Sequence, residues 1–187
     1  YEEQLSLDVG GFAFDPLGFV LYAFPWGEPG ELEDMQGPEP WQAEELAGIG
    51  EALRSGASLS DAVRKAIRRA VASGHGIGKS AFVAWVILWA FSTFKDARGV
   101  VTANTEAQLK GKTWPELAKW HRLCLCGHWF DCTATALISK LPGHERTWRC
   151  DMVPWSERNT EAFAGLHNKG KRVVLIFDEA SAIPDSI

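Results

Sequence analysis

The sequence predicts an α/β fold in which helices cover both faces of a mostly parallel β-sheet. Segments typical of strands alternate along the chain with segments typical of helices, which is the pattern of parallel sheets. Residues 172–177 (RVVLIF) have no polar alternation, so we expect a strand buried on both faces. The chain has 187 residues, of which 46% are hydrophobic and 23% charged, and this fits one globular domain and excludes a disordered chain.

The N-terminal part is expected to pack on the domain as an arm, and the alternative is an arm that binds a partner. Residues 1–40 are rich in Gly, Pro and aromatic side chains. Within them, Asp15 followed by Pro16 predicts the start of a short helix over residues 14–24. Residues 41–187 form the main domain, and it begins with a helix over 40–56 whose apolar residues recur at helical spacing and which we expect to stop at Gly56.

The remaining elements follow from local pattern. A short helix over 62–67 and a strand over 68–72 precede a cluster of glycines. Residues 79–93 are apolar on nearly all faces, which is typical of a buried helix. A buried strand is expected over 99–103, and a helix interrupted near Pro115 over 105–124. Further strands are expected over 147–153 and 162–166.

The glycine cluster resembles a phosphate-binding loop. Residues 73–80 read SGHGIGKS, between a predicted strand and a predicted helix, which is the context that such a loop requires. Glycines allow successive backbone N–H groups to turn towards an anion, and the helix that follows adds its positive end. Lys79 would reach the β- and γ-phosphates, and the Ser80 hydroxyl would bind Mg²⁺. The nucleotide-binding candidates are Ser73, Gly74, His75, Gly76, Ile77, Gly78, Lys79 and Ser80. Ser73 stands where the consensus has Gly, and the alternative is a glycine turn with a lysine in solvent.

Two adjacent acids follow the strongest predicted strand. Asp178 and Glu179 come directly after residues 172–177, and ligands of open parallel sheets bind outside the carboxyl ends of the strands. Asp178 can bind Mg²⁺, and Glu179 can act as the general base that polarises an attacking water. With Lys79, Glu179 is our candidate catalytic residue. The alternative is a strand that ends in solvated acids.

Several segments together resemble the ATPase domain of the terminase large subunit of tailed bacteriophages and prophages. They are VASGHGIGKSA (71–81), VTANTEAQL (101–109), NTEAFAGLH (159–167) and VVLIFDEASAIP (173–184), with FDPLGFVLYAFPWG (14–27) and PWQAEEL (40–46) nearer the N-terminus. The resemblance implies a P-loop NTPase fold of the additional-strand, helicase-like type. It also implies that residues 73–80 are the Walker A loop, that 173–179 are the Walker B strand, and that Trp41 and Gln42 contact adenine. The alternative for these last two residues is the start of an amphipathic helix with a buried tryptophan.

This family hydrolyses ATP with Mg²⁺ and drives double-stranded DNA into a procapsid. The resemblance therefore implies a small subunit and a portal protein as partners, assembly as a homo-oligomeric ring, and a place in the cytoplasm of the bacterial host. The net charge of −5 excludes a nucleic-acid binder that uses its whole surface. No membrane partner is expected, because the longest apolar-rich stretch, residues 81–91, is shorter than the roughly 20 residues that span a bilayer.

The chain departs from the family pattern in two respects. His75 stands where many terminases have an arginine, so an arginine finger is expected from Arg146, Arg149 or Arg158. The strand that should follow Walker B, and the C-terminal nuclease domain, lie outside these residues, so we expect a portion of a longer protein. A helicase-like, DNA-dependent ATPase of superfamily 2 and a nucleotide-binding assembly module are the alternatives.

Cysteine spacing does not favour a metal site. Cys124, Cys126 and Cys132 lie near His128, but the first two are closer together than zinc ligands usually are, so we expect buried or unpaired thiols.

Overall fold

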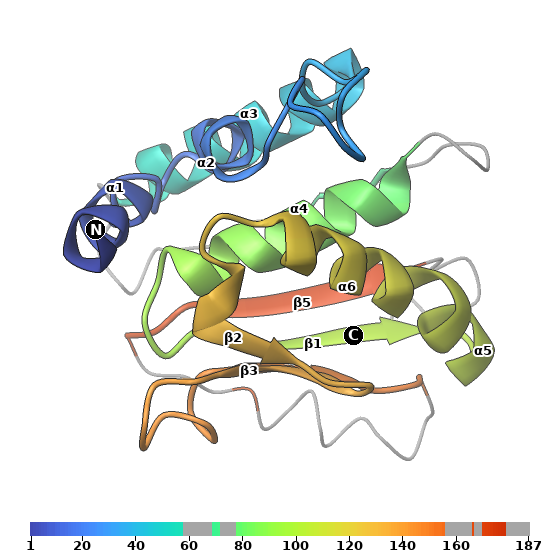
Figure 1. The fold of residues 1–187 in the computed structure, drawn as a ribbon. Coiled ribbons are helices and arrows are strands. Elements are labelled where there is room, and N and C mark those ends of the chain that lie inside the picture. The colour runs from blue at the N-terminus through green and yellow to red at the C-terminus, as the bar shows by residue number, and fades with distance from the viewer. Residues whose placement is uncertain (58–68, 72–77, 156–165, 167–169, 179–187) are drawn as a thin grey trace.

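The computed structural model describes residues 1–57, 69–71, 78–155, 166 and 170–178. A five-stranded mixed sheet lies beneath a layer of helices (Figure 1). The strands are β1 (Arg98–Ala103), β2 (Phe130–Cys132), β3 (Ala136–Ser139), β4 (Arg149–Met152) and β5 (Val173–Asp178). The helices are α1 (Glu2–Gly10), α2 (Pro16–Ala23), α3 (Pro40–Ala57), α4 (Lys79–Ser92), α5 (Glu106–Gln108) and α6 (Trp114–Leu123), with a π-helix η1 (Leu109–Thr113) and a 3₁₀-helix η2 (Gly127–Trp129).

The predicted α/β class is confirmed, but the sheet is mixed rather than mostly parallel. The strand order is β2-β3-β4-β1-β5, and β1 pairs in parallel with both β4 and β5. β3 pairs antiparallel with β2 and with β4. The short turn between β2 and β3 accounts for part of the difference, because strands joined so tightly can pair only as an antiparallel hairpin.

The described helices cover one face of the sheet, whereas helices on both faces were predicted. α4 and α6 lie directly on the sheet, and α1, α2 and α3 lie beyond α4 (Figure 1). Alternate side chains of a strand point to opposite faces. In β5, Val174 and Ile176 pack against the core, while Val173 and Leu175 are 42% and 38% exposed. The prediction that this strand is buried on both faces was therefore wrong.

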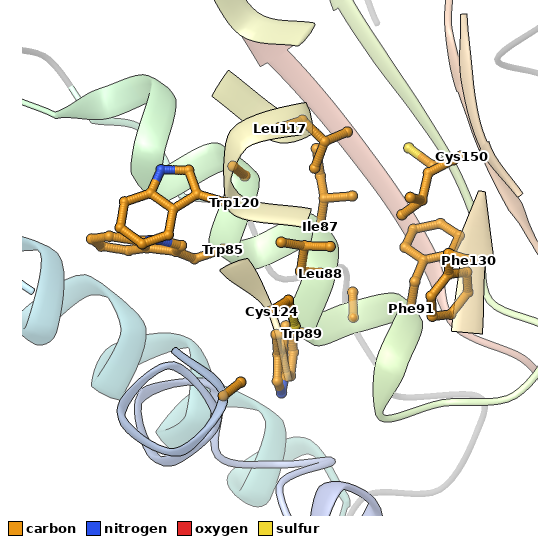
Figure 2. Close-up of a cluster of buried hydrophobic side chains, with 14 of the residues drawn as sticks. Trp85, Ile87, Leu88, Trp89, Phe91, Leu117, Trp120, Cys124, Phe130 and Cys150 are labelled. Atoms are coloured by element: carbon orange, nitrogen blue, oxygen red, sulfur yellow. The ribbon is translucent and has the colours of Figure 1, made fainter. Parts of the chain in front are cut away.

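The core is built around α4, whose residues are apolar on nearly every side as predicted. Figure 2 shows Trp85, Ile87 and Leu88 of this helix beside Leu117 and Trp120 of α6. The rings of Trp85 and Trp120 meet edge to face, with centroids 5.0 Å apart. Each fully buried leucine or isoleucine of this cluster contributes about 1.5–3 kcal/mol by leaving water. The same cluster takes in apolar side chains of α1 and α2, so residues 1–40 share this core.

Element boundaries agree with the local signals in most places. The Asp15 side chain accepts a hydrogen bond from the Gly18 N–H at 2.9 Å, and Pro16 starts α2, as predicted. α3 continues through Gly56, where a stop was expected. The helical segment that follows β1 is interrupted by η1, which ends two residues before Pro115, so the predicted interruption near this proline is confirmed.

Some predicted elements fall partly or wholly outside the described residues. Residues 69–71 have no regular secondary structure, so the predicted strand over 68–72 is wrong for its described part. The helix over 62–67 and the strand over 162–166, except Leu166, lie outside the described residues. In the part of the chain that is described, no helix combines the length and the apolar character needed to cross a bilayer.

Candidate functional site

Three elements converge at one end of the sheet. α4 has 14 residues and β1 has 6, so the helix is about 21 Å long and the strand about 20 Å. The chain runs along α4, reverses direction in the connecting turn, and runs back along β1 over nearly the same distance. The start of α4 therefore lies above the carboxyl ends of β1 and β5, as Figure 1 shows. Ligands of parallel sheets bind at this end of the strands.

The first turn of α4 depends on a glycine. Gly78 precedes the helix and has φ of 86° and ψ of 21°, in the left-handed region that other residues rarely adopt. A Cβ atom at Gly78 would also lie 2.6 Å from Nε2 of Gln42, which is closer than two non-bonded heavy atoms can approach without a clash. The described residues provide no side-chain cap for α4. Such a helix start presents backbone N–H groups and a positive dipole end to an anion.

Gln42 holds this turn from the first residues of α3. Its side chain is 3% exposed; Nε2 donates to the Gly78 carbonyl at 2.9 Å, and Oε1 accepts from the Glu39 N–H at 2.8 Å. The ring of the neighbouring Trp41 packs against Phe82, one turn into α4, with centroids 5.7 Å apart. The structure thus brings both residues of the predicted adenine segment to the start of α4, and both polar groups of the Gln42 amide are engaged by backbone.

Asp178 ends β5 and is held by a residue that the sequence did not indicate. It lies opposite Ala103, the last residue of β1, in the parallel register. The Thr113 hydroxyl donates a hydrogen bond to Oδ2 of Asp178. Thr113 is 1% exposed and is the last residue of the π-helix η1. π-helices occur frequently at functional sites, but no residue pattern in this segment predicts one.

Half of the predicted site lies among the described residues. Lys79 and Ser80 are half-buried in the first turn of α4, and Asp178 is half-buried at the strand end. Outside the described residues lie Ser73, Gly74, His75, Gly76, Ile77 and Glu179. The donors present, a hydroxyl and a carboxylate, are hard oxygen ligands. They fit Mg²⁺, which takes one or two protein oxygens together with substrate phosphates.

Other candidates from the sequence are placed away from this turn. Of the expected arginine fingers, Arg149 forms an ion pair with Asp151 at 2.6 Å on β4, and Arg158 lies outside the described residues. Cys124, Cys126, Cys132 and Cys150 are free thiols. Burial raises the pKa of the Cys132 thiol to about 11 and that of Cys150 further, so both are uncharged at neutral pH and pack as small apolar groups.

Comparison of the chain with protein-family models, with curated proteins and with solved structures finds no match.

Proposed function

We propose that this chain is the ATPase motor of a terminase large subunit of a tailed bacteriophage or prophage, with a P-loop NTPase fold of the additional-strand type. One observation carries the proposal on the structural side. A left-handed glycine directly before Lys79 opens a buried helix at the sheet end where β5 finishes in Asp178. The family itself is proposed from the sequence segments quoted above.

In this proposal, each residue acts through an interaction that its position allows. The Lys79 ammonium and the first N–H groups of α4 neutralise the phosphates of ATP. The Ser80 hydroxyl and the Asp178 carboxylate hold Mg²⁺, which neutralises charge on the phosphates when it is bound. Trp41 offers a half-buried ring for stacking on adenine, and Gln42 contributes by holding Gly78. Glu179 follows Asp178 and acts as general base towards the attacking water.

The proposed partners follow from the same family. They are double-stranded DNA, a small subunit, a portal protein and further copies of this chain in a ring, in the cytoplasm of the host cell. A helicase-like ATPase would have the same nucleotide site, so nucleotide binding does not distinguish it from a packaging motor. The two functions differ in their response to DNA. Stimulation of ATP hydrolysis by blunt duplex DNA supports the packaging motor, whereas unwinding of a duplex with a single-stranded tail supports the helicase.

Nucleotide binding by a Lys79→Ala variant tests the site. A fluorescent ATP analogue is titrated into the wild type, into this variant and into Lys95→Ala, which removes an exposed lysine beyond the other end of α4. We expect at least about tenfold weaker binding for Lys79→Ala, which is about 1.4 kcal/mol, and wild-type binding for Lys95→Ala. Equal affinity of the two lysine variants would remove Lys79 from the site.

A Glu179→Gln variant separates binding from chemistry. The amide keeps the size of the side chain but cannot accept a proton, so ATP binding should persist while hydrolysis falls by roughly 10²-fold or more. Turnover within about tenfold of the wild type would contradict a general-base role, since that role contributes 10²–10⁴-fold.

A further inference from the structure

The Asp178 carboxylate is bound on one oxygen only by the part of the chain that is described. Thr113 donates to Oδ2, and no described side chain bonds to Oδ1. A hydroxyl that donates to an ionised carboxylate forms a charge-assisted bond, which is shorter and stronger than a neutral one. This bond therefore restricts rotation of the carboxyl group and leaves its second oxygen available to a cation.

Thr113 is itself held in place from both sides. The next residue, Trp114, donates its indole N–H to the Thr133 carbonyl at 2.6 Å, and Leu109 at the start of η1 is buried in the core. Upstream, Thr105 caps α5 through a reciprocal pair of bonds with Gln108. The hydroxyl is thus presented by a fixed segment rather than by a loop.

Thr113 lies at the end of an irregular turn. Each residue of an α-helix turns the chain by about 100°, and the wider turn of η1 turns it by less, so the last residue of η1 projects in a different direction than it would in a regular α-helix. From this position the Thr113 hydroxyl bonds to Asp178.

We propose that Thr113 is a positioning residue for Asp178, and that its hydroxyl holds Oδ2 so that Oδ1 is oriented as a ligand for the magnesium ion of a bound nucleotide. The inference rests on the proposed function. Mg²⁺ demands near-ideal octahedral geometry, so a freely rotating carboxylate would be a poorer ligand. Groups that orient metal ligands in this way typically change metal affinity by about 10- to 100-fold when they are removed.

The test measures metal binding rather than turnover. Mn²⁺ is titrated into the protein with a non-hydrolysable ATP analogue, and free Mn²⁺ is followed by electron paramagnetic resonance. Thr113→Val removes the hydroxyl and keeps the shape, Thr113→Ser keeps the hydroxyl, and Thr102→Val is the matched control. Thr102 in β1 is 0% exposed and its hydroxyl has no hydrogen-bond partner among the described residues, so removing that hydroxyl breaks no bond in this part of the chain.

We expect Mn²⁺ binding to weaken by about 10- to 100-fold in Thr113→Val and to keep its wild-type affinity in Thr113→Ser and Thr102→Val. Metal-free binding of the analogue, measured in EDTA, should not change in any variant. Should Thr113→Val fail to fold, Thr113→Ala takes its place, and failure of both would assign Thr113 a purely structural role and overturn the inference.

Three further results are decisive. Wild-type Mn²⁺ affinity in Thr113→Val overturns the inference and leaves the proposed function standing. Weak binding in Thr113→Ser as well as in Thr113→Val shows that packing rather than the hydroxyl matters, and also overturns it. A wild-type protein that binds no nucleotide, with or without metal, overturns the proposed function and the inference with it.

Discussion

Replacing Gly78 by alanine tests how the start of α4 is built. At φ of 86°, an L-residue costs about 1–2 kcal/mol. The new Cβ would lie 2.6 Å from Gln42 Nε2, so the amide must move, and we expect it to lose its bonds to Gly78 and Glu39. These two partly buried hydrogen bonds contribute about 1 kcal/mol each. We therefore expect Gly78→Ala to lower the free energy of unfolding by about 3–4 kcal/mol.

The double variant Gly78→Ala/Gln42→Ala isolates the contact from the backbone strain. Once Gln42 is truncated, the clash and the two bonds no longer exist, so adding Gly78→Ala should cost only the 1–2 kcal/mol or so of left-handed strain. The effects of the two substitutions are then strongly non-additive, as is typical of residues in contact. Urea denaturation followed by tryptophan fluorescence gives each free energy of unfolding.

A control for the general effect of losing a glycine is Gly56→Ala in α3. No described residue lies within 4 Å of a Cβ at Gly56, and alanine favours a helix over glycine by about 1 kcal/mol, so this variant should be stabilised. Equal losses for Gly78→Ala in the wild-type and Gln42→Ala backgrounds would refute the contact. No loss in either background would refute the left-handed turn itself.

Two further predictions concern parts of the chain that hold the fold together. The Nδ1–H of His144 donates to Asp96 at 2.6 Å, and this bond lowers the pKa of the Asp96 carboxyl below its ordinary 3.8. The bond therefore stabilises the folded protein above pH 3.8, and its contribution is lost as the pH falls through the lower pKa of the folded state. Asp96→Asn should therefore unfold at a lower temperature than the wild type at pH 6, and the gap should narrow as the pH falls through the lowered folded pKa of Asp96. A gap that stays constant with pH would contradict this. Arg172 lies over the Trp89 ring at 4.5 Å and donates to the Ala13 carbonyl at 2.6 Å, and burial lowers its pKa to about 10. Arg172→Met should cost about 2–4 kcal/mol in urea denaturation, because the carbonyl is left unpaired and the cation–π contact is lost, and a change below about 0.5 kcal/mol would show that the guanidinium does not contribute.

The elements that sequence predicted well are those with a complete local signal. Asp15 is the N-cap of α2 and Pro16 is its first helical residue. The residues of α4 are apolar on nearly every side of the helix, which is typical of a buried helix. β1 and β5 follow from their β-branched residues alone. The exposed face of β5 could not be read in this way, because Val173 and Leu175 are as apolar as their buried neighbours and only the placement of other elements decides which face is covered.

The mixed sheet was missed for a different reason. β2 and β3 are short, with 3 and 4 residues, and β2 follows a stretch of chain in which cysteines and tryptophans carry no clear period. Their pairing is determined by the turn at Thr133, where the hydroxyl accepts from the Ala136 N–H at 3.0 Å. Such a turn is visible only once the hydrogen bonds are known.

In the candidate site too, the residues that belong to a local sequence motif could be predicted, whereas those whose partners are distant in sequence could not. That Lys79 and Asp178 belong to one end of the sheet follows from the rule that ligands of parallel sheets bind at the carboxyl ends of the strands. That rule does not identify the residues that bond to this part of the site. Gln42 bonds to Gly78, directly before Lys79, from 36 positions away, and Thr113 bonds to Asp178 from 65 positions away. Both are buried polar side chains whose partners come from other elements, and a buried polar side chain without its partner would be costly. The fold therefore constrains Gln42 and Thr113 as well as Lys79 and Asp178, although no motif marks Thr113 and the sequence indicated Gln42 only as an adenine contact.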